Sequence, residues 1–399
     1  MNPVRRRCVF YVSGFDPKGA AHYHGLYREE AIKQSATSGM AVEVGPRKRL
    51  PTGNSYWAIR ATVGDTDVDT HYEFMRWDDV VRNHWPKHTW QLWRDVLTTT
   101  VFNLWHGSLW KMFKLSWPPA LALFAPFVLL LGILLGMPLL ALLVGVFVAG
   151  QSDSQILGAL AGSCSALGLA WVGRRLEARY SMYWMMRSYA FTARQATGQA
   201  PELEERLDEQ ARRLVQRLEE AQDDEVLLVG HSSGSIMAAS ILARALRQLA
   251  LTRKVVPTLS FLTLGQWIPL LGVLPHATAF RQELQELGRA EHLHWIDFSA
   301  PPDGCCFALT DPLGACGVEV QGRHPDRLKL LSPRFAQMFD KAAYAEIRRD
   351  KFRVHFQYLM ASDRPSGYDY FLITAGELTL FDRYRQQPGI KDFKGLKLF

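Results

Sequence analysis

Two uncharged stretches in the middle of the chain constrain its fold more than any other feature of the sequence. Residues 115–152 form a run of 38 without Asp, Glu, Lys or Arg, and residues 154–173 form another run of 20. A helix needs about 20 apolar residues to cross the hydrocarbon core of a bilayer. The sequence therefore predicts a membrane-inserted segment, and the chain of 399 residues is long enough to build a large soluble core beside it.

The segment Glu225–Ser240 (EVLLVGHSSGSIMAAS) carries the clearest chemical motif. Four apolar β-formers precede Gly230, and a helical pattern of small residues begins at Ser233, so we expect a buried strand that turns abruptly into a helix. Residues 230–234 match G-x-S-x-G, in which the serine occupies a strained turn that exposes its hydroxyl. Ser232 is therefore the candidate nucleophile, and the alternative is a tight turn that merely contains serine.

The number of membrane crossings follows from the strands on either side of the uncharged stretches. Hydropathy alone permits three crossings, because the first stretch could divide at residues 136–138. Cys8–Ser13 (CVFYVS) also reads as a strand. If it shares a sheet with the strand before Gly230, both lie on one side of the membrane and the number of crossings is even. We predict two spans. The first, within Pro119–Gly150, would tilt, kink near Pro138 or lie partly in the interface, and the second covers about Ile156–Val172.

Charges beside this hairpin predict its orientation. Basic residues flank it on both sides, whereas the linking residues 151–155 contain no Lys or Arg. The flanking residues are Lys111, Lys114, Arg174, Arg175 and Arg179. The positive-inside rule then predicts a multi-pass protein of the cell membrane with both termini in the cytoplasm. The five cysteines lack disulfide or zinc spacing, which fits a reducing compartment, and the first apolar run is too short for a signal peptide.

The predicted domain organisation has two parts. Residues 1–115 and 174–399 are expected to form one soluble domain, into which residues 116–173 are inserted as the hairpin. The helix expected at residues 201–221 carries an apolar stripe that would pack on the sheet and a charged face that would be solvated. The apolar stretch Gln266–Pro275 is either packed core or a lid, an acyl-binding wall or a membrane contact.

Tryptophan is concentrated just before the hairpin. Seven of the twelve tryptophans lie here: Trp77, Trp85, Trp90, Trp93, Trp105, Trp110 and Trp117. Tryptophan favours the boundary between water and lipid, because its ring is apolar while its indole N–H requires a partner. Residues 87–114 are therefore expected to form an amphipathic helix on the membrane surface. The alternative is an aromatic core helix.

The net charge of +7 would suit either nucleic acid or an anionic membrane surface. Basic residues are dispersed apart from Arg5–Arg7 and Arg47–Arg49, so we favour the membrane and expect no nucleic-acid partner. The acidic run at Asp65, Asp67 and Asp69 lacks the glycine and the distal glutamate of a calcium loop. We therefore expect it to be a solvated turn and not a metal site.

Five segments occur in an order that resembles the α/β-hydrolase superfamily. They are CVFYVSGFDP, EVLLVGHSSGS, LSFLTLG, APPD and HFQYL. The GHSSG elbow is similar to that of lipases and related esterases. This resemblance implies an α/β fold with a mostly parallel sheet flanked by helices, and here a two-helix transmembrane hairpin is inserted before the nucleophile strand. The chain departs from secreted lipases in having that hairpin and no signal peptide, so the resemblance does not imply an extracellular role.

The resemblance also implies an acid that follows the nucleophile in the chain. Asp303 lies in a Pro-rich loop after the predicted strand Leu293–Phe298, where triad acids gather over the carboxyl edge of a sheet. Asp297 is the rival, although it lies inside the strand pattern. Asp311 is a more distant candidate.

The histidine and the oxyanion hole are assigned on the same basis. His355 is preferred as the base because its surroundings would fold against the core, whereas His324 lies in a polar turn. In the superfamily, a loop after an early strand and the residue after the nucleophile donate backbone N–H groups to the oxyanion. These donors would be Phe15 and Ser233. The alternative for residues 14–19 is a plain connection between a strand and a helix.

The function implied is that of a membrane-anchored serine hydrolase that cleaves a lipid or other amphiphilic ester through an acyl-serine intermediate. No metal or organic cofactor is required. A thioesterase or acyltransferase would use the same triad, and a non-catalytic membrane scaffold could share the fold. The sequence leaves the oligomeric state open.

Overall fold

A mostly parallel sheet runs through the part of the protein outside its two long apolar helices, in a computed structural model that describes residues 3–180, 182–252, 257–321 and 327–390. Eight strands follow the order β2-β4-β5-β1-β6-β7-β8-β9, and the short β3 pairs with β4. The pairs from β5 through β1 and β6 to β9 are parallel, whereas β4 pairs antiparallel with its neighbours. The strands are β1 (Arg6–Val12), β2 (Met40–Val44), β3 (Lys48–Arg49), β4 (Ser55–Val63), β5 (Thr66–Phe74), β6 (Glu225–His231), β7 (Thr258–Leu264), β8 (His294–Phe298) and β9 (Leu328–Leu331).

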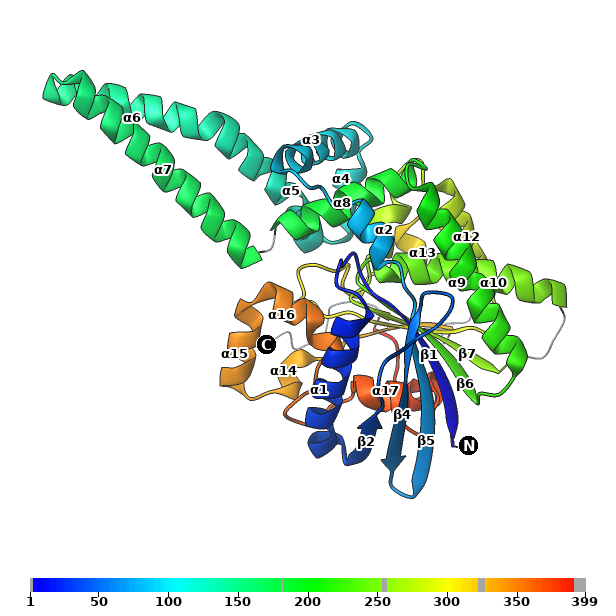
Figure 1. The fold of residues 1–399 in the computed structure, drawn as a ribbon. Coiled ribbons are helices and arrows are strands. Elements are labelled where there is room, and N and C mark those ends of the chain that lie inside the picture. The colour runs from blue at the N-terminus through cyan, green and yellow to red at the C-terminus, as the bar shows by residue number, and fades with distance from the viewer. Residues whose placement is uncertain (1–2, 181, 253–256, 322–326, 391–399) are drawn as a thin grey trace.

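Helices cover both faces of the sheet (Figure 1). Those before the sixth strand are α1 (Ala20–Ser38), α2 (Asp78–Asn83), α3 (Thr89–Trp105), α4 (Ser108–Leu115), α5 (Trp117–Leu131), α6 (Met137–Ser152), α7 (Gln155–Tyr180), α8 (Met182–Ala196) and α9 (Pro201–Glu220). Those after it are α10 (Gly234–Thr252), α11 (Ile268–Gly272), α12 (Thr278–Arg289), α13 (Pro312–Ala315), α14 (Phe335–Met338), α15 (Lys341–Arg349), α16 (Lys351–Phe356), α17 (Tyr370–Ala375) and α18 (Leu380–Tyr384). A π-helical turn spans Gly132–Gly136, and a 3-10 turn spans Gln357–Leu359.

The first strand lies beside the strand that precedes the G-x-S-x-G motif. β1 and β6 pair in parallel, with Cys8 opposite Val226 and Tyr11 opposite Val229. The two parts of the chain on either side of the hairpin therefore form one sheet. This confirms the expectation from which an even number of crossings was derived.

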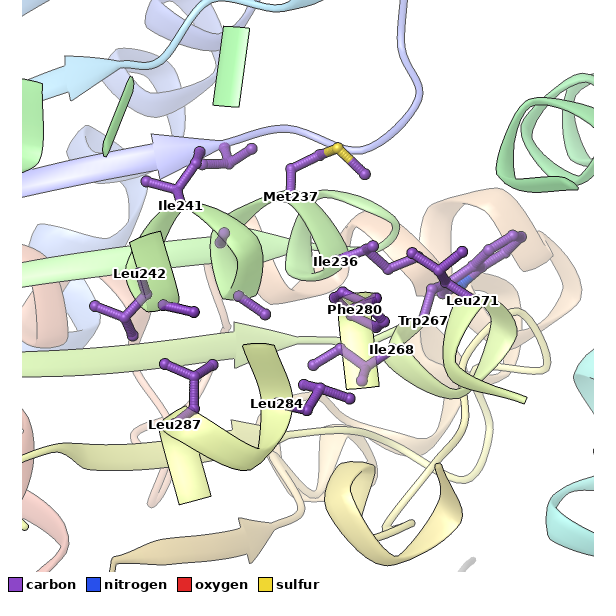
Figure 2. Packing of buried hydrophobic residues seen from close by; sticks show 14 of the residues in the cluster. Ile236, Met237, Ile241, Leu242, Trp267, Ile268, Leu271, Phe280, Leu284 and Leu287 are labelled. Atoms are coloured by element: carbon purple, nitrogen blue, oxygen red, sulfur yellow. The ribbon is translucent and has the colours of Figure 1, made fainter. Parts of the chain in front are cut away.

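Side chains of the central strands alternate between two apolar clusters. Cys8 and Phe10 of β1 belong to the cluster that includes α9, α10 and α12, whereas Val9 and Tyr11 belong to the cluster that includes α1 and α17. Because both faces are buried, these strands read in the sequence as uninterrupted apolar runs. Figure 2 shows part of the first cluster, where side chains of α10, α11 and α12 such as Ile236 meet.

The uncharged stretches form two long antiparallel helical segments that project from the sheet domain (Figure 1). Trp117–Ser152 and Gln155–Glu177 are both long and apolar enough to cross a membrane, and their side chains are mostly exposed. Two spans were expected, although both helices extend beyond the predicted bounds. The first is distorted at the π-helical turn 132–136, and Pro138 then lies at the start of α6. The helical segment is continuous through this point, and π-helical turns and prolines are the usual sites at which a long helix is distorted.

Small residues line the seam between α6 and α7. A Cβ atom added to Gly158 would lie 2.5 Å from the carbonyl oxygen of Gly145 and 2.7 Å from Cβ of Ala149. A Cβ atom at Gly162 would collide with the carbonyl oxygen of Ala141. The two helix backbones therefore approach as closely as they do only because the seam lacks side chains, as in membrane helix pairs with small-xxx-small spacing.

We expect Gly158→Val to separate the two helices by roughly 2 Å, because interaxial distance depends on side-chain size at the contact. Gly168→Val is the matched control, since a Cβ atom there meets nothing within 4 Å. The measurement is the distance between spin labels on exposed Leu139 and Leu167, in a cysteine-free background in lipid nanodiscs. Equal distances in Gly158→Val and in the wild-type background would contradict the packing.

The Trp-rich segment divides between core and surface. Trp77 is buried, and its indole N–H donates a 2.9 Å hydrogen bond to the carbonyl oxygen of Ser13. Trp90, Trp105 and Trp110 are 59, 86 and 66% exposed on α3 and α4. Residues 87–114 thus form two helices broken at Gly107, and not the single helix expected. Their exposed tryptophans are compatible with a membrane surface, and contact with a membrane stays a prediction.

Three further expectations concern the sheet domain. The acidic run Asp65, Asp67 and Asp69 is not a turn throughout, because Gly64 and Asp65 alone make the turn and β5 begins at Thr66. The charged face of α9 is not simply solvated, since Arg213 forms a 2.8 Å ion pair with the buried Glu73. For the apolar stretch Gln266–Pro275, the packed-core alternative agrees with the structure, since residues 266–274 are buried and contain α11.

Candidate active site

Ser232 lies at the sharp turn between β6 and α10. Its φ is +58°, in the left-handed region that a non-glycine residue rarely occupies, and such strain is typical of functional turns. A Cβ atom at Gly230 would lie 2.7 Å from Cα of Ser235, and one at Gly234 would collide with the carbonyl oxygen of Val12. Strand, turn and helix therefore pack so closely that only glycine fits on either side of the serine.

Asp303 and His355 form a hydrogen-bonded pair, although they come from different elements. Asp303 follows β8 in the chain, and His355 lies on α16. The His355 Nδ1 atom is 2.9 Å from Asp303 Oδ2, and the carboxyl group is fully buried. Burial acts to raise the pKa of Asp303, but the imidazole charge and hydrogen bond of His355 outweigh it and hold that pKa below its usual value. The carboxylate is therefore the acceptor, and Nδ1 carries the proton.

Further donors hold the Asp303 carboxylate in place. The backbone N–H of Cys305 donates to Oδ1 at 3.0 Å, and the hydroxyl of Tyr358 donates to Oδ2 at 3.1 Å. The Tyr358 oxygen in turn accepts a 2.8 Å hydrogen bond from the backbone N–H of Ala300. Asp303 is thus fixed in position and orients the His355 ring.

The rival acids are engaged elsewhere. Asp297 is buried within β8, where its carboxyl group accepts 2.7 Å hydrogen bonds from the hydroxyls of Thr263 and Ser299. Asp311 caps α13 through the backbone N–H of Leu313. The rival base, His324, lies outside the residues that the structure describes.

Ser232 and His355 line one pocket with Gly14, Phe15 and Ser233. Within the described parts of the chain, no hydrogen bond joins the Ser232 hydroxyl to His355. Catalytic hydrogen bonds are often long before substrate binds and shorten in the complex. The pocket therefore brings together four of the five residues selected from the sequence, namely Ser232, His355, Phe15 and Ser233. The fifth, Asp303, does not line the pocket and contacts the Nδ1 atom of His355.

The first loop approaches the nucleophile closely. A Cβ atom at Gly14 would lie 3.3 Å from Ser232 Oγ. The backbone N–H of Phe15 is directed at the elbow, where it donates a 2.8 Å hydrogen bond to Ser233 Oγ. The sequence placed Phe15 correctly beside the elbow but did not reveal that the Ser233 side chain accepts this N–H.

His231 is a site residue that the sequence reasoning left without a role. Its Nε2 atom is 3.0 Å from the carbonyl oxygen of His355, which can only accept, so Nε2 carries the proton. Burial, followed by the charge of His355, lowers the pKa of His231 to about 3, so the ring is neutral at physiological pH. His231 thus ties the base to the elbow, and its place as the first variable residue of G-x-S-x-G was the available signal.

The described residues contain no group of three or more His, Cys, Asp or Glu side chains placed to hold a metal ion. Comparisons with protein-family models, with curated proteins and with solved structures find no match. The fold and the site therefore establish a mixed α/β protein with a mostly parallel sheet, flanking helices and two long apolar helices inserted in mid-chain.

Proposed function

We propose that the protein is a membrane-anchored serine hydrolase of the α/β-hydrolase type, with Ser232, His355 and Asp303 as its triad. The observation that carries the proposal is the buried His355–Asp303 pair in a pocket shared with a serine on a strained elbow. A nucleophile, a base and a group that orients the base are the parts that acyl transfer requires.

In the proposed mechanism, Ser232 Oγ attacks the acyl carbonyl carbon while His355 Nε2 removes the hydroxyl proton. Asp303 stabilises the resulting imidazolium and keeps Nδ1 protonated. The C–O bond to the leaving group then breaks, and His355 returns the proton to the departing alcohol. Water, activated by the same imidazole, releases the carboxylic acid from the acyl-serine.

The oxyanion of the tetrahedral intermediate would be stabilised by the backbone N–H groups of Ser233 and Phe15. The Phe15 N–H becomes available when the Ser233 hydroxyl, its present acceptor, rotates away. Both donors belong to segments at the carboxyl ends of neighbouring strands, β6 and β1.

The substrate class is inferred from the surroundings of the site. Trp184, Met185, Phe352 and Phe356 give the pocket apolar walls. The exposed tryptophans of α3 and α4, together with the two long apolar helices, would hold the domain at a cytoplasmic membrane surface. A lipid or another amphiphilic ester would partition into that place. A thioesterase or acyltransferase would use the same groups and differs only in which nucleophile accepts the acyl group.

We expect a fluorophosphonate probe to modify the full-length protein at Ser232, and Ser232→Ala to abolish labelling. The physical reason is that the probe reacts only with a hydroxyl that a neighbouring base activates. Labelling is measured by mass spectrometry, and Ser38→Ala, on the distant helix α1, is the control that should label normally. A folded wild-type protein that resists the probe would instead favour a non-catalytic membrane scaffold.

A further inference from the structure

A lysine lies one helical turn from the proposed catalytic base. Lys351 is the first residue of α16 and His355 the fifth, a spacing that places both on one face of the helix. Both side chains line the pocket of Ser232. Among the described residues that line this pocket, Lys351 is the single lysine, and none is an arginine. The face of α16 that presents the base therefore also presents a positive charge.

The Lys351 ammonium has no ion-pair or hydrogen-bond partner within the described residues. The nearest acid in the chain, Asp350, uses its carboxylate to accept a 2.9 Å hydrogen bond from the backbone N–H of Arg353. Asp350 does not line the pocket, and the acid that does, Asp16, accepts hydrogen bonds from the backbone N–H of Lys18 and the hydroxyl of Tyr23. The charge of Lys351 is thus left unpaired.

The charge of Lys351 reaches the interior of the pocket. Burial and the negative charge of Asp303 raise the pKa of the Cys305 thiol, and the positive charge of Lys351 opposes them. Cys305 lines the same pocket. The field of the ammonium group therefore acts where a substrate would lie, and not only at the outer surface.

Apolar rings lie beside this charge. The Phe352 ring packs 5.4 Å from that of Trp184 on α8 and 4.7 Å from that of Phe356, measured between ring centroids. An aromatic wall next to an unpaired cation suits a molecule that has a hydrocarbon portion and an anionic group close together.

We propose that Lys351 binds a phosphate or carboxylate group of the substrate, so that the enzyme acts on anionic amphiphilic esters. This inference rests on the proposed hydrolase function and narrows its substrate class. A lysine ammonium acts as a point charge towards phosphate and carboxylate, and partial burial strengthens the attraction over that in water.

The test is protection of Ser232 from the fluorophosphonate probe in the full-length protein in zwitterionic nanodiscs. Dodecyl phosphate, dodecanoate and dodecanol have the same chain and differ in head group. We expect the two anions to protect at concentrations about tenfold lower than dodecanol does, the effect of one hydrogen bond to a charged group. Comparing phosphate with carboxylate shows which anion the site prefers.

Variants assign the effect to Lys351. Lys351→Met should remove the advantage of the anions, and Lys351→Arg should retain most of it. Lys341→Met is the matched control, because Lys341 is also the first residue of a helix, follows a capping aspartate and is exposed outside the pocket. In Lys341→Met, the anionic ligands should protect Ser232 at the same concentrations as in the wild-type protein.

The two proposals fail in different ways. If Ser232 is labelled but the three ligands protect equally, or if Lys351→Met keeps the preference for anions, the inference is overturned while the hydrolase function stands. If wild-type Ser232 is not labelled at all, the proposed function falls, and the inference falls with it.

Discussion

Asp303→Asn and His355→Ala should each lower kcat for a soluble chromogenic ester by about a thousandfold or more, the size of effect seen when a triad member is removed. The carboxylate of Asp303 accepts the Nδ1 proton of His355 at 2.9 Å, and an asparagine amide at that place would favour the wrong tautomer of the ring. The imidazole could then no longer take the Ser232 proton. Steady-state hydrolysis and the rate of probe labelling measure the loss.

The control for this experiment is Asp297→Asn. Asp297 was the rival acid, and its carboxyl group is bonded to Thr263 and Ser299 instead of a histidine. It should hydrolyse the ester at a rate close to that of wild type. Full activity in Asp303→Asn, together with its loss in Asp297→Asn, would show that the triad acid is misassigned.

The second large effect concerns the pH dependence of stability. Burial raises the pKa of Asp297 from its ordinary 3.8 to about 7, although the hydroxyls of Thr263 and Ser299 oppose this. Between about pH 4 and 7 the folded protein retains a proton that the unfolded chain releases. Folding is therefore weakened as pH rises through this interval, by about 4 kcal/mol once pH exceeds 7.

Asp297→Asn removes this titration. We expect the unfolding free energy of the variant to rise relative to wild type by a few kcal/mol between pH 4 and pH 8. Thermal unfolding of the detergent-solubilised protein at a series of pH values measures the difference. Asp153→Asn, in the exposed link between α6 and α7, is the control and should show no such trend. A constant difference for Asp297→Asn would mean that its carboxyl group is ionised throughout.

Much of the architecture could be predicted because it depends on local patterns. The strands predicted at Cys8–Ser13 and Leu293–Phe298 correspond to β1 and β8, since apolar and β-branched runs between turn formers are typical of strands. The short β3 and β9 were not expected, because two to four residues are too few for a periodic pattern. Their pairing depends on the order of the strands in the sheet, which the sequence does not reveal.

The candidate site was predictable in the same uneven way. Ser232 was recognised because its motif is local, whereas Asp303 and His355 are 52 residues apart and meet only through the fold. The Ser233 hydroxyl that accepts from Phe15 and the Lys351 charge in the pocket left no recognisable pattern in the sequence. Such contacts depend on side-chain directions across different elements.

The sequence by itself determined the elbow and the two long apolar helices, because residue spacing and hydropathy act over a few neighbouring residues. Only the tertiary structure decided which acid meets which histidine, since Asp297 and Asp303 are only six residues apart yet face different partners. Burial and hydrogen-bond partners depend on the whole chain. They lower the pKa of the Asp303 carboxyl group and raise that of Asp297.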